Sequence, residues 1–410
     1  MPLKVFQTII IGGGPAGLFT AISIGRDDTL ILEKNSQPGR KLLIAGSGRC
    51  NVTHTGPISD FFGRYGSHGS FVKKALKEFT NDDLIGFLIS RGLNTVVDKN
   101  GKVFPETDRA EDVLSCLLAE CKAIGVEIKR EKSVVSVSKA NDLFVVTSEK
   151  ETFYCNALVV ATGGSSYPTT GSSGDGYQFA KSLGHSIVTP KPALTPVFVK
   201  DYRMSELAGV SLQNVSVSLY RGDKKLLVRR GDLGFTHKGI SGPGIIDFSR
   251  YFEVGDVLRI NLIDCNEDKF KQLFVDSVVS QGNMTVQALL RNYDIPKSLM
   301  RIVLEEVNVD PSDYLSNITA LKRNKLIVLL CSYPFEIERV GGFKMAMTTA
   351  GGVCLDEVSS KTMESKLVSN LYFVGEVLDV DGDTGGYNIQ AAFSTGYVAG
   401  KSIVKSIGEK

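Results

Sequence analysis

The chain has 410 residues, of which 42% are hydrophobic and 22% charged, as in an ordinary globular protein with more than one domain. Its net charge of +2 is too balanced to favour nucleic acid or an anionic membrane as the main partner. No apolar run reaches the roughly 18 residues that a membrane span needs, and the N-terminal run ends in glycines. We therefore expect a cytoplasmic protein with neither a membrane span nor a signal peptide.

Three short segments at the N-terminus predict a βαβ unit. Residues 4–11 form an apolar, β-branched run that ends in glycines, which is typical of a buried strand. Residues 15–26 read as a helix with proline in its first turn, where the missing N–H costs nothing. Residues 29–34 predict a second buried strand. Buried strands of this kind indicate a parallel sheet that is covered on both faces.

The rest of the chain changes character several times. We expect helical structure at 70–91 and at 109–124, and a meander of short strands at 126–161 that returns to the parallel sheet. Prolines between 190 and 196 mark a boundary. Beyond that boundary the predicted elements are a β-rich insert or small barrel at 193–263, helices within 266–331, a buried strand at 370–375 and a helix at 388–405. The pattern indicates a discontinuous α/β domain that is interrupted by an insert.

A dinucleotide-binding fingerprint follows the first strand. Gly12, Gly14 and Gly17 have G-x-G-x-x-G spacing, which permits a tight turn, close approach to a pyrophosphate, and close helix–strand packing. The phosphate would lie at a helix N-terminus, where free N–H groups favour an anion. Glu33 ends the second strand, where a carboxylate can accept hydrogen bonds from ribose hydroxyls. The alternative is a glycine turn without a ligand.

Two later stretches favour a flavin over a nicotinamide cofactor. An acid at position 33 fits an unphosphorylated ribose, as in FAD or NAD. "ALVVATGG" (157–164) is a second strand that ends in glycines, and "NLYFVG" (370–375) is a third. Gly385 and Gly386 then open a helix, whose N-terminus suits the N1/O2 edge of a flavin, where negative charge develops on reduction.

Five motifs together resemble one family, the BaiN-like or aminoacetone oxidase-like FAD-dependent oxidoreductases, within the two-dinucleotide-binding-domain flavoproteins. The motifs are "IIIGGGPAGL", "GRKLLIAGSGRCNVTH", "ATGGSSYPTTGSSGDGY", "FTHKGISGP" and "TMESKLVSNLYFVGEVLDVDGDTGGYN". The resemblance covers nearly the whole chain, and the motifs come in the family's order. Thr384 departs from the residue that relatives often carry before the two glycines, which bears on the surroundings of the flavin.

The resemblance implies a Rossmann-like FAD-binding domain interrupted by an insert. We expect the FAD-binding domain at 1–190 and 341–410, a β-barrel at 191–265 and 332–340, and a small helical subdomain at 266–331. The implied FAD-binding residues are Gly12, Gly14, Ala16, Gly17, Glu33, Lys34, Arg40, Lys41, Ser47, Gly48, Arg49, Cys50, Asn51, Val134, Ala161, Thr162, Gly163, Gly375, Glu376, Asp379, Gly385, Gly386, Tyr387, Asn388 and Ile389.

Cys50 is a candidate redox residue with several alternatives. The seven cysteines include no C-x-x-C pair, so a zinc ribbon or a disulfide framework is not expected. A dithiol relay needs a second cysteine nearby, and position 55, where a C-x4-C pair would place it, is Thr55. The interpretation that we favour is that Cys50 packs as a small apolar residue, while Arg49 and Asn51 contact the flavin.

The other candidates for chemistry are isolated side chains. His237 could act as an acid, a base or a substrate anchor, and Tyr167 could donate from its hydroxyl group. Structural roles for both remain open. Asp379, Asp381 and Asp383 resemble the start of a calcium loop, but position 12 of that loop is Gln390. We expect no metal.

These features predict an FAD-dependent oxidoreductase that transfers a hydride between the flavin and a small-molecule substrate. No second G-x-G-x-x-G follows another strand, so NAD(P)H would visit only transiently as electron donor. An amine oxidase that uses oxygen as acceptor is the first alternative. The others are an RNA-associated flavoprotein, which the near-neutral charge disfavours, and a flavin-binding protein without turnover. The sequence does not predict the substrate or the oligomeric state.

Overall fold

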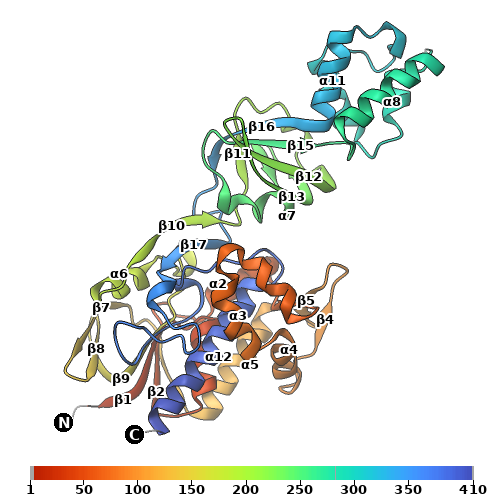
Figure 1. Cartoon of the computed structure of the whole chain (residues 1–410). Coiled ribbons are helices and arrows are strands. Elements are labelled where there is room, and N and C mark those ends of the chain that lie inside the picture. The colour runs from red at the N-terminus through yellow and green to blue at the C-terminus, as the bar shows by residue number, and fades with distance from the viewer. Residues whose placement is uncertain (1–3, 282, 409–410) are drawn as a thin grey trace. The chain divides into compact units, whose positions relative to one another are not determined.

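The computed structural model describes residues 4–281 and 283–408 and divides the chain into two compact units (Figure 1). Unit 1 comprises Met1–Ala193 and Phe343–Lys410, and unit 2 comprises Leu194–Gly342. Each unit has its own cluster of buried apolar side chains. Within the described residues, every helix is too short or too polar to traverse a lipid bilayer.

A seven-stranded sheet forms the centre of unit 1, in the order β6-β2-β1-β9-β8-β7, with β18 also paired to β9. The strands β6, β2, β1, β9 and β18 run parallel, and β9, β8 and β7 form an antiparallel meander. Their bounds are β1 Val5–Ile11, β2 Thr29–Leu32, β6 Glu127–Lys129, β7 Val134–Ala140, β8 Leu143–Ser148, β9 Thr152–Val160 and β18 Leu371–Phe373. The predicted meander and its return to the parallel sheet are confirmed.

Two helices of unit 1 cross closely, α1 (Pro15–Ile24) and α12 (Tyr387–Gly408). A Cβ atom at Gly396 would lie 2.7 Å from the carbonyl oxygen of Ala16, and one at Gly400 would lie 2.8 Å from that of Thr20. The backbones can approach this closely only because these positions carry no side chain. The remaining helices of unit 1 are α2 Arg40–Ile44, α3 Gly69–Glu78, α4 Asn81–Ile89, α5 Ala110–Ile124 and α6 Asp175–Ser182.

The helical residues expected at 70–91 form two helices, α3 and α4. The break falls at Phe79 and Thr80, between α3 and α4. Thr80 accepts a hydrogen bond from the N–H of Asp83, whose carboxylate accepts one from the N–H of Thr80. This capping box starts a new helix at a point where apolar periodicity alone shows no interruption.

Short elements complete unit 1. Strands β3 (Thr53–His54), β5 (Lys102–Pro105) and β4 (Thr95–Val97) form one small sheet, and β10 (Ile187–Ala193) pairs with β17 (Thr348–Val353). The 3-10 helices among the described residues of both units are Ala45–Gly48, Ile58–His68, Pro168–Thr170, Ser205–Leu207, Ser249–Tyr251, Leu315–Asn317, Leu355–Glu357 and η8 Gly375–Val377.

Unit 2 contains a closed barrel in the order β11-β14-β13-β12-β15-β16 and a group of helices. The strands are β11 Val197–Val199, β12 Ser211–Arg221, β13 Lys224–Phe235, β14 Gly239–Ser241, β15 Val257–Asn261 and β16 Tyr333–Val340. The helices are α7 Pro243–Ile246, α8 Glu267–Ser280, α9 Val286–Leu290, α10 Lys297–Glu306 and α11 Ala320–Ser332. Alternate residues of β12 and β16 are buried, as the alternation in the sequence indicates. The predicted fold class is confirmed.

Candidate functional site

The carboxyl ends of β1, β9 and β18 meet at one edge of the central sheet. Ile11 pairs with Val160, which pairs with Phe373 on its other side. Each strand then ends in a turn: Gly12 follows β1, residues 161–164 follow β9, and Gly375 follows β18 shortly after. Ligands of open α/β sheets bind at this edge. The fold therefore brings together the three glycine-rich segments that the sequence singled out.

The three fingerprint glycines have different roles. Gly12 has φ of +110°, and its Cβ would lie 2.4 Å from the carbonyl oxygen of Ala161. A Cβ at Gly17 would lie 2.0 Å from the carbonyl oxygen of Gly12. By contrast, no heavy atom of the described residues lies within 4 Å of the Cβ position at Gly14 beyond its chain neighbours. Backbone packing thus requires Gly12 and Gly17, whereas Gly14 borders open space.

The N-terminus of α1 is suited to an anion. Gly14 is the N-cap, and no described side chain caps the helix. Pro15 occupies the first turn and Ala16 follows it in the helix. The free backbone N–H groups therefore point into the space beside Gly14, where a pyrophosphate would satisfy them.

Glu33 lies at the end of β2 with only 6% of its surface exposed. Its Oε2 accepts a hydrogen bond from the N–H of Gly13 at 2.9 Å. Its Oε1 accepts two from Asn35, from the N–H at 2.8 Å and from Nδ2 at 2.7 Å. A carboxylate has about four acceptor positions, so about one remains on Oε2 for a ribose hydroxyl. The uncapped helix, the open space at Gly14 and this oriented acid fit the adenosine diphosphate part of FAD.

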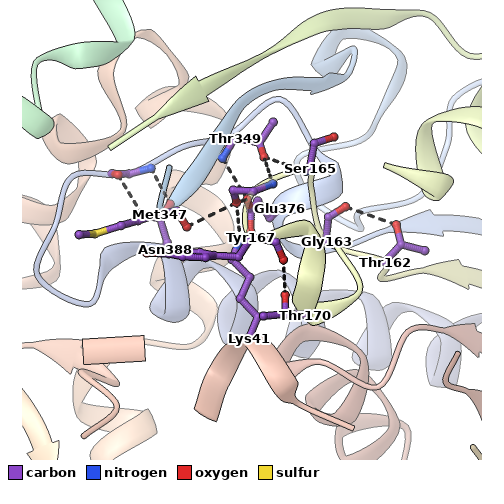
Figure 2. Close-up of polar contacts among 12 residues, drawn as sticks. Lys41, Thr162, Gly163, Ser165, Tyr167, Thr170, Met347, Thr349, Glu376 and Asn388 are labelled. Atoms are coloured by element: carbon purple, nitrogen blue, oxygen red, sulfur yellow. Dashed lines mark hydrogen bonds and ion pairs between the residues drawn. The ribbon is translucent and has the colours of Figure 1, made fainter. Parts of the chain in front are cut away.

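A second polar cluster joins four segments of unit 1 (Figure 2). Lys41 of α2 donates to Glu376 of η8 at 2.6 Å and also to the hydroxyl of Ser166. The other oxygen of Glu376 accepts from Ser166 at 2.8 Å and from the N–H of Thr349 at 2.9 Å. The Thr349 hydroxyl accepts from the N–H groups of Ser165 and Ser166 at 2.9 and 3.1 Å. The ion pair is partly buried, with 24% and 19% of the two side chains exposed.

The loop 46–54 lies against the turn that opens α12. A Cβ at Gly386 would lie 2.6 Å from the carbonyl group of Thr53. Asn51 donates from its amide to the carbonyl oxygens of Thr53 and Val103 at 2.7 and 3.0 Å, so it holds the loop. Ser47 adopts the left-handed backbone conformation, and Gly48 follows it with φ of +87°.

Arg49 has protein partners on the surface of unit 1. Its guanidinium pairs with Asp108 at 2.6 Å and lies 4.2 Å from the centre of the Phe104 ring. About half of its side chain is exposed. The contact of Arg49 and Asn51 with a flavin, which the sequence analysis expects, stays a prediction.

Cys50 is completely buried and has a left-handed φ of +59°. Burial raises the pKa of its thiol to about 12, because a thiolate would be desolvated there. A neutral, inaccessible thiol is a poor nucleophile. This environment supports the interpretation of Cys50 as a packing residue.

The start of α12 is held by contacts with its own loop and with Tyr65. Asn388 accepts from the N–H of Gly382 at 2.7 Å and donates to its carbonyl oxygen at 2.9 Å. The Tyr65 hydroxyl donates to the carbonyl oxygen of Tyr387 at 2.8 Å. Gly385 has φ of +118°, and Ile389 lies in the first turn of the helix.

Several other expected residues lie at the same edge of the sheet. Gly375 has φ of +71°, and its Cβ would lie 2.8 Å from the Cβ of Ala16. Asp379 accepts from the N–H of Gly351 at 2.9 Å. Thr162 and Gly163 belong to the turn after β9. Val134 begins β7, two residues after Lys132, whose N–H donates to the carbonyl oxygen of Glu33 at 2.9 Å.

The other catalytic candidates, Tyr167 and His237, belong to different units. Tyr167 lies in unit 1 with φ of +50° and donates its N–H to the carbonyl oxygen of Phe343 at 2.9 Å. His237 is exposed in the turn between β13 and β14 of unit 2. Among residues 4–281 and 283–408, no group of three or more His, Cys, Asp and Glu side chains could hold a metal ion.

Sequence reasoning missed three residues of this region, Asn35, Ser166 and Thr349. Asn35 carried a signal, because it lies two residues after the acid that ends β2. Ser166 lies inside a quoted motif but has no distinguishing spacing. Thr349 reaches the site only through the pairing of β17 with β10, which no local pattern indicates.

A family model described as "HI0933-like protein Rossmann domain" matches residues 6–402. The chain belongs to the HI0933-like family. Members of this family are the FAD-dependent oxidoreductases that the motifs resemble, so the expected family is confirmed. The chain is therefore a flavin-dependent oxidoreductase that uses FAD.

Three curated relatives are similar over almost their entire lengths. Two ribosomal RNA dihydrouridine synthases are each 32% identical, one from Haemophilus influenzae (97% of this chain, 98% of the relative) and one from Escherichia coli (98% and 99%). A 3-dehydro-bile acid delta(4,6)-reductase from Clostridium scindens is 31% identical (96% and 98%).

Solved structures share the fold at low sequence identity. A 3-ketosteroid-delta4-(5alpha)-dehydrogenase from Rhodococcus jostii RHA1 has a TM-score of 0.50 and 14% identity, covering 97% of this chain and 96% of that chain. An E. coli quinol fumarate reductase has a TM-score of 0.53 and 13% identity, covering 100% and 71%. At such identities the likeness shows the fold alone.

Proposed function

We propose that this enzyme reduces a carbon–carbon double bond that is conjugated to a carbonyl group, with FAD as the hydride carrier. The observation that carries the proposal is the agreement between two differently named sets of relatives. Formation of dihydrouridine saturates the ring double bond of uracil beside its carbonyl group. A delta(4,6)-reductase acting on a 3-dehydro bile acid saturates double bonds conjugated to the 3-oxo group. One reaction type covers both.

The uracil ring of an RNA is the first substrate to test, because two relatives at 32% identity are named for it. A conjugated ring ketone is the second, supported by the relative at 31%. We expected a small-molecule substrate for a flavin-dependent oxidoreductase, and no nucleic acid because the net charge is only +2. That expectation is untested, since RNA binding depends on the local arrangement of Lys and Arg rather than on their total.

We assign different parts of FAD to different residues at the edge of the sheet. The N–H groups of α1 beside Gly14 hold the pyrophosphate, and the free acceptor position of Glu33 holds a ribose hydroxyl. The Lys41–Glu376 cluster lies at the ends of β9 and β18 and offers both a cation and a carboxylate to polar groups of the cofactor. FAD, when bound and reduced, supplies the hydride.

The N-terminus of α12 has a separate role. Its turn is fixed by the close approach of Gly386 to Thr53 and by the Asn388 contacts with Gly382. The positive end of a helix of this length stabilises negative charge near its first turn. This turn would stabilise the edge of a flavin ring that becomes negative on reduction.

The electron donor is proposed to be NADH or NADPH. The chain has one G-x-G-x-x-G fingerprint, which the FAD site uses, so the donor would bind transiently. The donor would deliver a hydride to bound FAD. Reduced FAD would in turn supply that hydride to the substrate carbon remote from the carbonyl group, while a proton from solvent would complete the carbon beside the carbonyl group. Oxidation of an amine by the flavin, with oxygen as acceptor, is the competing reaction.

Turnover with defined substrates tests the proposal. Purified holoenzyme is incubated with NADH or NADPH and either an unmodified ribosomal RNA fragment or a steroid with 4,6 double bonds and a 3-oxo group. We expect a product with two more hydrogen atoms by mass spectrometry, and loss of NAD(P)H absorbance in equal amount. Absence of product from both substrates, with flavin reduction by amines instead, would overturn the proposal in favour of an amine oxidase.

A further inference from the structure

The side chain of Asn35 joins the acid at the end of β2 to a segment that is far away in sequence. Its Nδ2 donates to Glu33 Oε1 at 2.7 Å and to the carbonyl oxygen of Thr170 at 3.2 Å. Its Oδ1 accepts from Arg40 at 3.1 Å. Both amide hydrogens and the amide oxygen are therefore in use, which leaves this side chain one orientation.

The segment 167–175 approaches Asn35 closely at Gly171. Gly171 in this segment has φ of +103°, and its Cβ would lie 2.5 Å from Asn35 Nδ2. Lys34 provides a second anchor, because its ammonium group pairs with Asp175 at 2.5 Å. The two residues that directly follow Glu33 thus both hold the segment 167–175.

We propose that Asn35 is a positioning residue for the nucleotide, which orients Glu33 toward the ribose and fastens the segment 167–175 beside it. The two hydrogen bonds from Asn35 fill the acceptor positions of Oε1, so the free position of the carboxylate is on Oε2. Without the amide, the carboxylate keeps only the backbone N–H groups of Gly13 and Asn35 and is held less firmly, and the segment loses its attachment at Thr170. The ligand class that depends on Asn35 is an adenosine diphosphate group.

Binding of FAD and of ADP to the apoprotein tests this role. Asn35→Ala removes the amide, and Asn35→Asp replaces its N–H donors with a carboxylate that repels Glu33. The matched control is Asn156→Asp, since the amide of Asn156 in the middle of β9 donates to Gln7 near the start of β1, away from the carboxyl ends of both strands. We expect both Asn35 variants to bind FAD and ADP about tenfold more weakly, by the same factor, and the control to bind as the wild type does.

The spectrum of the bound flavin separates positioning from a general loss of structure. We expect the visible band of FAD bound to the Asn35 variants to match the wild type, because the change concerns the adenosine side. FAD and ADP affinities within twofold of wild type would overturn the proposal, and so would loss of FAD affinity without loss of ADP affinity or with an altered visible band. Should either Asn35 variant fail to fold, Gly171→Ala provides the test. Its methyl group displaces the segment 167–175 from Asn35, so this variant must lose the same affinity for FAD and ADP. These measurements use no substrate, so they are independent of the proposed reaction.

Discussion

The environment of single residues decides which of the candidate side chains can react. Cys50 follows an arginine in a glycine-rich loop, a sequence that fits an activated thiol as well as a packing residue. Its complete burial and the pKa of about 12 show a neutral thiol enclosed by the core. The burial of a side chain depends on contacts with distant parts of the chain, which the local sequence does not show. The sequence alone therefore left Cys50 open as a reactive thiol or as a packing residue.

Replacing Cys50 with serine tests this point. We expect Cys50→Ser to retain FAD and to be reduced by its electron donor within about twofold of the wild-type rate, with a destabilisation of about 1–3 kcal/mol from the buried hydroxyl. Rates come from anaerobic rapid mixing, and stability from thermal unfolding. Normal FAD content together with loss of flavin reduction would show that the thiol takes part in the reaction.

Glu33 shows how far residue types in a motif predict a site. The spacing of Gly12, Gly14, Gly17 and Glu33 predicts a tight turn followed by a helix, with an acid at the end of the next strand, and the fold contains both; the binding of a phosphate and a ribose there stays a prediction. The orientation of the carboxylate depends on Asn35 and on the N–H of Gly13, which the motif does not include. Ser166 and Thr349 contact Glu376 only after β17 and the turn following β9 have come together, so the sequence offers no signal for them.

At the scale of elements, glycine positions set the spacing between α1 and α12. A Cβ at Gly396 would lie 2.7 Å from the carbonyl oxygen of Ala16 and 3.1 Å from the hydroxyl of Thr20. Because Ala16 lies in the first turn of α1, this crossing also positions the N–H groups that we assign to the pyrophosphate. Packing of the helices and binding of the cofactor are therefore coupled.

Gly396→Ala should destabilise the protein by about 1–3 kcal/mol and weaken FAD binding, because backbone atoms must move apart. Gly86→Ala in α4 is the control: no described atom beyond its own helix and chain neighbours lies within 4 Å of its Cβ position, and alanine favours a helix by about 1 kcal/mol. Chemical unfolding and FAD titration measure both effects. A Gly396 variant as stable as wild type would show that the helices can separate at no cost.

A buried histidine, His185, contacts two residues that are distant in the sequence, Glu357 and Ser365. His185 lies between α6 and β10, with its side chain fully buried. Its Nε2 is 2.8 Å from the Ser365 hydroxyl, and its Nδ1 is 3.2 Å from a carboxylate oxygen of Glu357. Burial lowers the pKa of His185 below 6.5, although Glu357 opposes this shift. The folded state therefore holds a neutral imidazole where the unfolded chain would take up a proton.

Stability should fall as the pH decreases below 6.5, because the unfolded state then binds one more proton than the folded state. Burial acts to raise the pKa of Glu357, but its hydrogen bond from Ser186 and the nearby His185 hold that pKa below 4.5, so the Glu357 contribution is lost only at lower pH. We expect His185→Gln to weaken the dependence of the melting temperature on pH just below pH 6.5. The exposed control His237→Gln should leave that dependence unchanged. An unaltered pH dependence in the His185 variant would contradict the assignment.

At the scale of the whole molecule, two buried clusters correspond to the two units. Changes in composition along the chain predict the α/β part, the barrel and the helices because each has a different hydrophobic period. The pairing order of the strands and the closure of the barrel depend on contacts between distant residues. The sequence therefore predicted no pairing order, and the expectation of a β-barrel rested on the motif resemblance as well as on the alternation. We propose that the units are separate folding domains.

Calorimetry tests this proposal. All the residues that we assign to FAD lie in unit 1, so FAD should stabilise that unit alone. We expect two unfolding transitions, of which FAD at 100 times its dissociation constant stabilises one by about 2.7 kcal/mol and leaves the other unchanged. A single transition that shifts as a whole would show that the units unfold together.

The most direct test of the central claim is a single turnover without oxygen. Holoenzyme whose FAD has been reduced by light is mixed with a uracil-containing ribosomal RNA fragment or with a steroid that carries 4,6 double bonds and a 3-oxo group. We expect the visible flavin band to return with one of these two substrates, in step with a product that has gained two hydrogen atoms. Reduced FAD that persists with both substrates and is reoxidised only when oxygen is admitted would contradict the central claim.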